Sequence, residues 1–140
     1  MRMEDIGPVV QMETQIYEFP WSEGNFKDSL SAGYSCWMMY GAGALAGYAV
    51  VMTGVEEAHL LNLSVAVARQ RQGLGKKLME HLRAMAKAQA ARKFLLEVRE
   101  SNWVARKFYA SQGFAELGVR RYYYPTRDGR EDAVIMELML

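Results

Sequence analysis

The chain has 140 residues, of which 51% are hydrophobic, and its 17 basic and 16 acidic side chains leave a formal net charge of +1. A chain of this length suits one domain that spans residues 1–140 and buries a proper core. The near-neutral charge argues against an extended nucleic-acid surface, and no apolar run reaches the ~18 residues of a membrane span.

The ends and the rare residues exclude further classes of protein. Met1–Asp5 lacks the apolar core of a signal peptide, so we expect a cytoplasmic protein with no membrane partner. Cys36 is the only cysteine, which excludes an internal disulfide. His59 stands alone in a strand-like run and His81 lies in a helical run, so we expect no metal site.

Hydrophobic periodicity and breaker residues predict a mixture of helices and strands. Asp5 can cap the first helix with Pro8 in its first turn, and Ser22 can cap the second. Gly41-Ala42-Gly43 lies between two runs that form a hairpin, and Gly113 is placed to end the last helix. In chain order we expect helices at 6–17 and 22–30, strands at 34–40, 44–52 and 57–65, a helix at 76–90, a strand at 94–99, a helix at 102–111, and strands near 116–124 and 133–138.

The segment Gln70-Arg71-Gln72-Gly73-Leu74-Gly75 joins a buried-strand pattern to a helix pattern. The first backbone N–H groups of a helix have no intrahelical partner, and the helix dipole adds partial positive charge there. Glycines leave room for an anion, and Arg71 and Lys76 flank the turn with cations. The segment therefore predicts a pyrophosphate cradle, with a tight strand–helix connection as the alternative. It matches neither the P-loop pattern nor G-x-G-x-x-G.

A second group of candidate residues follows in the strand and helix at 94–111. Glu97 lies in an otherwise apolar run, where a partly desolvated carboxylate can serve as a general base. Its alternative role is an ion pair with Arg99 or another cation at the sheet edge. Asn102 and Tyr109 lie about two turns apart on one helix face, where Tyr109 could also be a packing residue.

Taken together, these motifs resemble the GCN5-related N-acetyltransferase (GNAT) superfamily. The resemblance rests on the Q/R-x-x-G-x-G turn, then Glu-Val-Arg at 97–99, then Asn102, Phe-Tyr at 108–109 and Gly-Phe at 113–114. Phe19-Pro20-Trp21-Ser22 near the start, and Arg121–Pro125 with Asp128–Ala133 near the end, are similar to the bacterial RimI branch. That branch acetylates the N-terminal alanine of a ribosomal small-subunit protein.

The resemblance implies an α+β fold, in which a central, mixed, mostly antiparallel twisted sheet is flanked by helices in three α/β/α layers. It implies acetyl-CoA as co-substrate without a metal, Glu97 as general base and Tyr109 as general acid. Asn102 would contact the cofactor. The remaining implied cofactor contacts are the strand residues Leu63, Ser64 and Val65 for pantetheine and the turn residues Arg71, Gln72, Gly73, Leu74, Gly75 and Lys76 for pyrophosphate.

The chain departs from the family pattern at two places. Ala66-Val67 replaces the Asp-Pro or similar pair that often precedes the cradle. The chain also begins so close to its first helix that the usual first strand must be very short.

The expected acceptor is the N-terminus of a ribosomal small-subunit protein. An α-amine has a pKa of ~7.7–8.0 against ~10.4 for lysine, so it is easier to deprotonate at neutral pH. The Phe19–Ser22 turn and the Arg121–Pro125 segment would form two walls of a peptide groove. The expected substrate-binding residues are the aromatics Phe19, Trp21, Tyr122 and Tyr124, while Asp128, Glu131 and Asp132 could either complement a basic peptide or remain solvated.

Three alternatives stay open from the sequence. A GNAT enzyme could acetylate a lysine side chain, a polyamine or a small-molecule amine with the same fold and cofactor turn. A non-catalytic acyl-CoA-binding module would need neither Glu97 nor Tyr109. An RNA-binding module is suggested by the basic and aromatic run at 120–124, although the near-neutral charge argues against it.

Overall fold

The computed structural model describes residues 1–140 and contains every helix and strand that the periodicity predicts, with ends displaced by a few residues. The helices are α1 (Ile6–Ile16), α2 (Glu23–Ser31), α3 (Leu74–Ala88) and α4 (Trp103–Ser111), with 3-10 turns at Met3–Asp5 and Val67–Arg69. The strands are β1 (Ser35–Gly41), β2 (Ala44–Thr53), β3 (Glu57–Val65), β4 (Lys93–Arg99), β5 (Ala115–Pro125) and β6 (Arg130–Met139). No helix is long and apolar enough to cross a membrane.

Local sequence explains most of the helix ends. Ser22 caps α2, because its hydroxyl accepts a hydrogen bond from the Asn25 N–H. Gly113 follows α4 with a φ of 99°, which a residue without Cβ adopts freely. Asp5 does not cap α1 as predicted. Its carboxylate instead accepts the Arg2 N–H at 2.7 Å and closes the preceding 3-10 turn.

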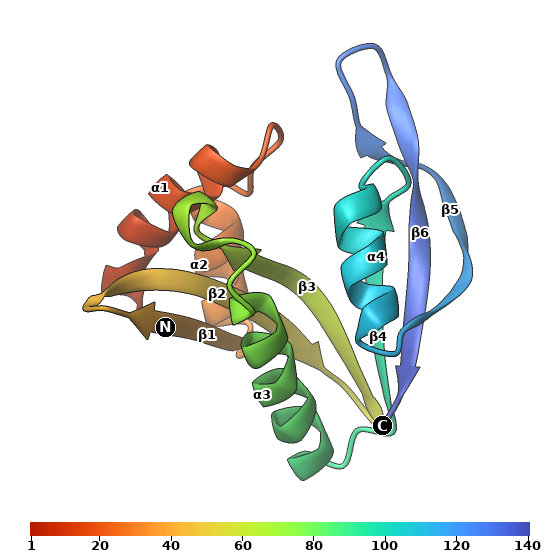
Figure 1. Ribbon diagram of the computed structural model, residues 1–140, viewed down its shortest axis with the longest axis horizontal. Coiled ribbons are helices and arrows are strands. Elements are labelled where there is room, and N and C mark those ends of the chain that lie inside the picture. Colours follow the sequence, from red (N-terminus) through yellow and green to blue (C-terminus); the bar gives the residue numbers. More distant parts are fainter.

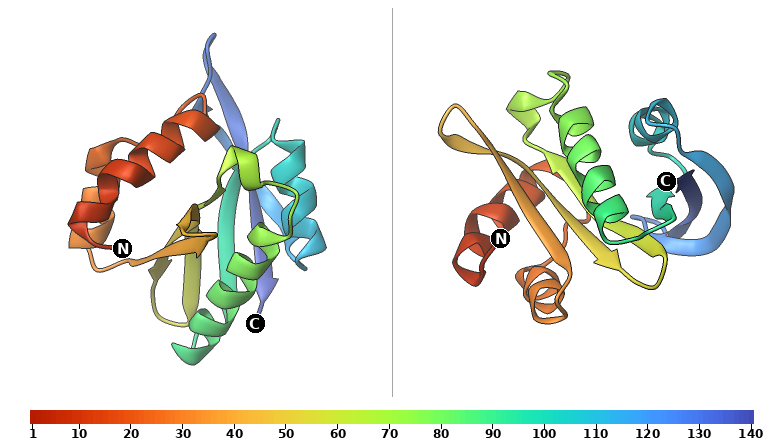
Figure 2. Two further views of the ribbon diagram at one scale, coloured as in Figure 1. Left: turned by 60° about the vertical axis from the view of Figure 1, so that its left-hand side comes forward. Right: turned by 90° about the horizontal axis from the view of Figure 1, so that it is seen from below.

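The six strands form one sheet in the order β1-β2-β3-β4-β6-β5. All neighbouring pairs are antiparallel except β3 and β4, which run parallel. Helices α1 and α2 lie on one face of the sheet and α3 and α4 on the other (Figures 1 and 2). This arrangement confirms the predicted α+β fold, with a mixed, mostly antiparallel sheet between helical layers.

Each face of the sheet has its own apolar core. On the α3/α4 face, Met79, Leu82, Phe94 and other residues form a cluster of 17 buried side chains. On the α1/α2 face, the cluster is smaller and includes Ile6 and Phe26. No strand precedes α1, and the Met1 ammonium donates to the Cys36 carbonyl at 3.1 Å on the edge strand β1.

The parallel pair opens partway along its length. Strands β3 and β4 are paired only from Glu57↔Lys93 to Leu60↔Leu96, although both continue beyond those residues. Figure 1 shows them close together near the C-terminus and well apart at their other ends. A bulge at the same level of β3 shifts its register with β2, so that Leu60 packs on the α3 side and Asn62 bonds to α1 on the other. The sheet therefore has no β3–β4 pairing beyond Leu60 and Leu96.

Candidate active site

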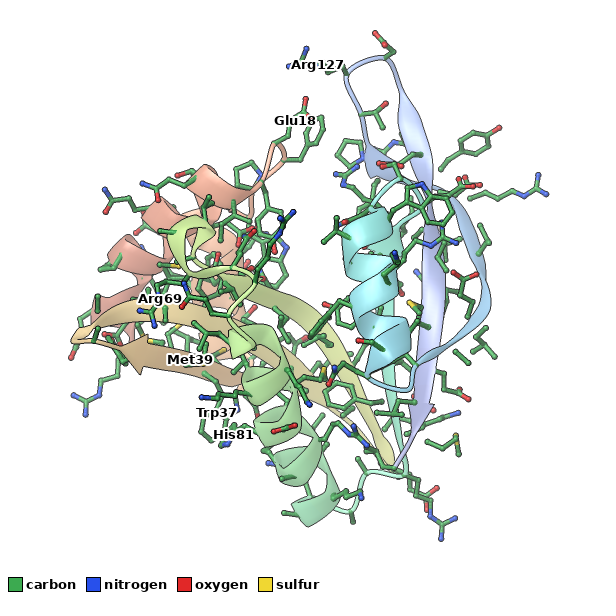
Figure 3. The ribbon with its side chains drawn as sticks, viewed as in Figure 1. Glu18, Trp37, Met39, Arg69, His81 and Arg127 are labelled. Carbon is green, nitrogen blue, oxygen red and sulfur yellow. The ribbon has the colours of Figure 1, made fainter.

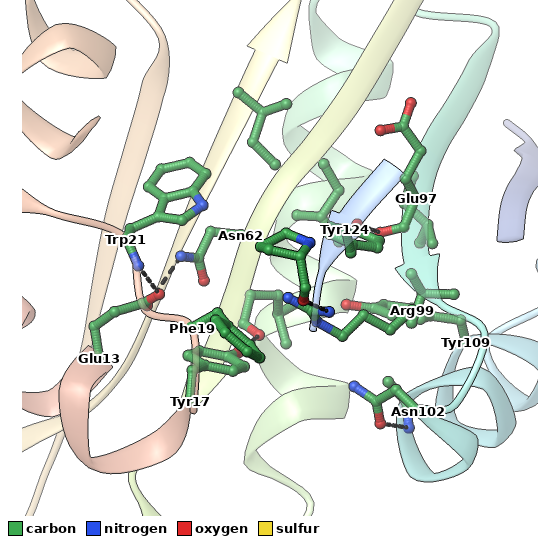
Figure 4. Close-up of a pocket in the computed structure, with 17 residues that line it drawn as sticks. Glu13, Tyr17, Phe19, Trp21, Asn62, Glu97, Arg99, Asn102, Tyr109 and Tyr124 are labelled. Atoms are coloured by element: carbon green, nitrogen blue, oxygen red, sulfur yellow. Dashed lines mark hydrogen bonds between the residues drawn. The ribbon is translucent and has the colours of Figure 1, made fainter. Parts of the chain in front are cut away.

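A cleft of about 340 Å³ lies where β3 and β4 part, and it passes from one face of the sheet to the other. Along β4 its lining alternates, because successive strand side chains point to opposite faces. Leu96 and Val98 belong to the α3/α4 core, whereas Glu97 and Arg99 point to the face that carries α1 and α2. The cleft thus connects two sides of the molecule, each with its own set of groups (Figure 4).

Glu97 lines this cleft with a side chain that is 12% exposed. Its Oε1 atom lies 3.4 Å from Arg120 Nε and 3.7 Å from His59 Nε2. The Tyr124 hydroxyl donates to the backbone carbonyl of Glu97 at 3.1 Å. The alternative role, an ion pair with Arg99 or another cation at the sheet edge, is therefore met by Arg120 on the edge strand β5, whereas Arg99 bonds to Glu131 and to the Pro125 carbonyl. His59, which we expected to stand alone, is instead a direct neighbour of this carboxylate.

Tyr109 and Asn102 reach the cleft from α4, as the helical spacing predicted. Tyr109 packs its ring against Phe114, and its hydroxyl has no hydrogen-bond partner in the protein. Burial raises the pKa of Tyr109 above its ordinary value, so the phenol stays protonated at neutral pH. The Asn102 side-chain carbonyl accepts the Ala105 N–H at 3.1 Å and so caps α4 at the edge of the cleft.

The turn before α3 presents a row of free backbone donors. Arg71 and Gly73 have left-handed backbone with φ values of 64° and 77°, and the first intrahelical bond is from Lys77 N–H to the Gly73 carbonyl. None of the N–H groups from 71 to 73 donates to a backbone carbonyl, and those of the first helical turn have no helical acceptor. Successive N–H groups in such a turn form an anion-binding concavity.

The two glycines of this turn do different things. A Cβ at Gly73 would meet no atom within 4 Å, so its missing side chain leaves open space beside the free donors. A Cβ at Gly75 would lie 3.4 Å from the Phe108 ring, so Gly75 permits close packing between α3 and α4. Arg71 and Lys76 are exposed beside the turn. The free N–H donors, the open space beside Gly73 and the two exposed cations fit a pyrophosphate. This fit supports the hypothesis that the turn can hold the cofactor's pyrophosphate mainly through its backbone.

The turn is held in place from outside. Arg69 donates to the Gly41 carbonyl at 3.3 Å and to Gln72 Oε1 at 3.2 Å, which ties the turn to the β1–β2 hairpin (Figure 3). Gln70 Nε2 donates to the Val65 carbonyl at 3.0 Å. Its shape therefore depends on side chains that leave the backbone N–H groups free.

The β3 segment from Leu63 to Val65 has β2 on one edge and no strand on the other, because β4 has turned away. Two of its carbonyls are already used, because Leu63 accepts the Tyr17 hydroxyl at 3.3 Å and Val65 accepts Gln70 Nε2, so backbone N–H groups are what this edge can offer a ligand in the cleft. The side chains are used within the protein. Ser64 is buried, and its hydroxyl bonds to the Tyr17 hydroxyl at 2.7 Å and to Asn62 Oδ1 at 2.6 Å.

Glu13 was not predicted as a site residue, yet its carboxylate lines the cleft, is 2% exposed and has no cationic partner. Its Oε1 accepts the Tyr48 hydroxyl at 2.6 Å and Asn62 Nδ2 at 3.0 Å, and its Oε2 accepts the Trp21 N–H at 2.9 Å (Figure 4). These bonds anchor the α1–α2 loop to the sheet. The sequence held a signal for this residue, because Glu13 continues the buried helix face of Ile6 and Val9.

The two predicted groove walls face each other across the opening of the cleft on the α1 side of the sheet. The Arg99 guanidinium lies between the rings of Phe19 and Tyr124, at 5.0 and 4.6 Å from their centroids. Trp21 also lines the cleft. Tyr122, predicted to lie in the same groove, lies outside it. Its backbone is displaced in a bulge of β5, and its side chain is 72% exposed.

Two of the three acidic residues at 128–132 of the β5–β6 hairpin, Glu131 and Asp132, bond within the protein. Glu131 accepts hydrogen bonds from Arg99 and Ser101, and Asp132 accepts the Tyr122 N–H. Arg127 at the hairpin tip donates to Glu18 of the α1–α2 loop at 2.8 Å, so the two walls also meet at their outer ends (Figure 3).

Comparison with known proteins supports the same architecture. Residues 6–114 match the acetyltransferase (GNAT) family. The ribosomal protein bS18-alanine N-acetyltransferase of Escherichia coli K12 is 40% identical over 134 residues, which cover 96% of this chain and 90% of that protein. The Haemophilus ducreyi protein of the same name is 37% identical over 138 residues, covering 98% and 95%. A crystal structure of the Escherichia coli enzyme matches with a TM-score of 0.92 and 39% identity, covering 99% of this chain and 90% of that one.

Proposed function

This chain belongs to the GNAT family of acetyltransferases, and we propose that it moves the acetyl group of acetyl-CoA to the N-terminal α-amine of a ribosomal small-subunit protein, with alanine as the acceptor residue. The observation that carries this proposal is the cleft that crosses the sheet. One side of it is lined by Asn102 and Tyr109 at α4, the helix against which Gly75 of the donor turn packs, and the other by a carboxylate and an aromatic groove.

On the cofactor side, the proposal assigns the pyrophosphate to the backbone N–H groups of 71–76 and the pantetheine arm to the free edge of Leu63–Val65. Asn102 at the start of α4 would contact the same ligand. A nucleotide-bearing thioester held in this way directs its acetyl group into the gap between β3 and β4. The family's use of acetyl-CoA and the fit of the turn to an anion both support this assignment.

On the acceptor side, Glu97 takes a proton from the incoming ammonium group. The neutral amine then attacks the thioester carbonyl, which a backbone N–H of the free β3 edge can polarise. The carbon–nitrogen bond forms, the carbon–sulfur bond breaks, and Tyr109 gives its proton to the departing thiolate. Its raised pKa keeps the phenol protonated until that moment, and burial places it beside the cleft rather than in bulk solvent. The nitrogen loses its second proton as the amide forms, and this proton restores the Tyr109 phenol.

The groove favours a peptide terminus as acceptor. Phe19, Trp21 and Tyr124 line an opening with room for the first residues of an extended chain. Arg99 lies over the rings of Phe19 and Tyr124, and Glu13 holds the Trp21 backbone. The relatives named after a ribosomal acceptor support the same choice. The proposal treats residues 1–140 as one catalytic domain that acts in the cytoplasm, where ribosomal proteins are made.

The test compares acceptors under identical conditions. Wild-type protein is incubated with acetyl-CoA and a peptide that begins with alanine, and CoA release and product mass are followed. The matched control is the same peptide with a blocked N-terminus and one added lysine, and polyamines form a third arm. We expect transfer to the free N-terminus. Equal or faster acetylation of the blocked peptide would transfer the assignment to lysine side chains.

A further inference from the structure

In the proposed reaction, Glu97 and Tyr109 do not account for one proton that must be released to solvent. An ammonium group and a thioester give an amide, a thiol and one free proton. Two protons leave the nitrogen, and only one returns to sulfur. In every turnover, therefore, one proton must travel from the carboxyl group of Glu97 to solvent. Glu97 is 12% exposed and is covered in part by its neighbours, so the route depends on which of them can accept a proton.

The charged and titratable groups facing Glu97 come from two strands. From β5, Arg120 approaches at 3.4 Å, Tyr124 bonds to the backbone carbonyl of Glu97, and Tyr123 lies near enough for the Glu97 carboxylate to help raise its pKa. The guanidinium of Arg120 stays fully protonated at accessible pH and has no acceptor atom, so it cannot receive another proton. Burial and the nearby carboxylate raise the pKa of Tyr123 and of Tyr124, which keeps both phenols protonated. None of the three can accept a proton at neutral pH.

From β3 comes His59, the remaining neighbour. Its Nε2 lies 3.7 Å from Glu97 Oε1, and 26% of its side chain is exposed, so it touches both the carboxylate and solvent. Neutral imidazole is the side chain that accepts and releases protons in the physiological range. The contact is longer than a hydrogen bond, and catalytic contacts of this kind often shorten only when substrate is bound.

We propose that His59 carries the substrate's proton from Glu97 to solvent. The O–H bond formed on Glu97 breaks, an N–H bond forms at His59 Nε2, and the resulting imidazolium loses a proton to bulk water before the next turnover. This inference rests on the proposed acetyl transfer, but not on the identity of the acceptor, since any ammonium substrate has the same balance. His59 touches neither the amine nor the thioester and acts through Glu97.

The first test is His59→Gln, which keeps an amide donor and removes the titratable ring. We expect kcat to fall by about tenfold, below the 10²- to 10⁴-fold effect of a group that exchanges protons with substrate directly. The KM for acetyl-CoA should stay the same, and added imidazole should restore part of the rate in a concentration-dependent way. The matched control is His81→Gln, because His81 is the only other histidine and lies on α3 against the edge of Trp37 (Figure 3).

Two further variants separate a relay from a charge effect or a structural effect. In a Glu97→Gln background, His59→Gln should cause little additional loss, since the relay has nothing to receive. His59→Lys keeps a cation beside Glu97 but accepts no proton at neutral pH, so it should stay as slow as His59→Gln. A wild-type rate in His59→Lys, or a slow His59→Gln without imidazole rescue, would overturn the relay.

A chemical arm applies if His59→Gln fails to fold. Diethyl pyrocarbonate treatment of His81→Gln can modify only His59 among the histidines, and we expect a loss of rate that hydroxylamine reverses. Full activity of the modified protein would overturn the relay. If wild-type protein acetylates none of the amines, the proposed function itself fails. If it acetylates them and His59→Gln is as fast as wild type, only the relay fails.

Discussion

The two sides of the cleft are built by different means. The cofactor side is made largely from the backbone of one short segment, the turn from Arg71 to Lys76, whose N–H groups stay free. The acceptor side is made from side chains that come from α1, the loop after it, β3, β4 and β5. In Figure 4 the labelled residues of the acceptor side converge from separate elements.

This difference predicts different responses to substitution. Backbone donors do not depend on the identity of side chains such as Leu74, so changes in the turn should be tolerated where they spare its shape and the Arg69–Gln72 bond. The acceptor side depends on hydrogen bonds between buried polar groups. Removing one partner there leaves others unsatisfied, at about 1–3 kcal/mol for each group. The predictions below test this contrast, from the largest expected effect to the smallest.

Tyr109→Phe should separate chemistry from packing where the two sides meet. The ring and its contact with Phe114 remain, and only the proton donor is lost. We expect turnover to fall by about 10²-fold or more with little change in melting temperature. Steady-state rates and thermal unfolding measure the two effects. Tyr40→Phe on β1, where the side chain is 60% exposed, is the control. Normal turnover in Tyr109→Phe would make this tyrosine a packing residue.

Glu13→Ala should destabilise the protein by about 2–4 kcal/mol, because several buried donors lose their acceptor together. Glu13→Gln keeps the volume and one carbonyl oxygen, so it should fold better but hold the Trp21 loop less firmly. We expect a higher KM for the peptide and an unchanged dissociation constant for acetyl-CoA. Urea unfolding and peptide kinetics measure these effects.

Glu4→Gln is the control for the Glu13 variants, since this carboxylate is largely exposed and pairs only with Arg2. If both KM and acetyl-CoA binding change equally in Glu13→Gln, the two sides are not separable as we describe.

Gly73→Val should weaken acetyl-CoA binding at least tenfold, on the order of 1.4 kcal/mol, because the branched side chain would fill the space beside the free donors. A positive φ strains any residue with a Cβ, so a matched control is required. Gly33→Val provides it, since Gly33 has a φ of 80° and equally open surroundings in the turn after α2. Calorimetric titration of both variants compares them. Equal weakening in Gly33→Val would assign the effect to backbone strain.

Tyr17, whose hydroxyl bonds to buried Ser64 on the acceptor side, should also make the free energy of unfolding fall at alkaline pH. Burial, opposed by the Ser64 hydrogen bond, raises the pKa of Tyr17 from 10.0 to about 12. Between these values the folded protein keeps a proton that the unfolded chain releases. The stabilisation is therefore complete below pH 10 and is lost as pH rises toward 12. By pH 10.5 the loss from Tyr17 alone is about 0.8 kcal/mol.

Urea unfolding at pH 8 and 10.5 tests this, with Tyr17→Phe as the comparison. The variant should lose correspondingly less stability between the two pH values than wild type does. An identical decrease in both proteins would show that Tyr17 does not titrate differently in the folded state.

Much of the fold follows from local patterns. The β3 strand was predicted at its observed bounds, and Ser22 and Gly113 were predicted at the helix ends they occupy. Those features depend on a few neighbouring residues, for which periodicity and capping chemistry suffice. Asp5 failed as a cap because Arg2, only three residues away, offered its carboxylate a competing N–H donor.

The sequence predicted only some of the residues that line the groove. Phe19, Trp21 and Tyr124 line the cleft, whereas Tyr122 does not, because a bulge in β5 breaks the alternation on which such predictions depend. Nothing in the local pattern around residues 120–124 marks where two extra residues enter the strand.

The sequence by itself determined the family, the order of the elements and the position of the turn whose backbone N–H groups stay free. Each of these is encoded within a contiguous stretch, where neighbouring residues act on one another directly. Only the tertiary structure decided that Glu97 faces His59 and Arg120 instead of Arg99, and that Glu13 anchors the acceptor loop. Those partners lie far apart in the chain and meet because β3 and β4 pair briefly, part, and leave a cleft through the sheet.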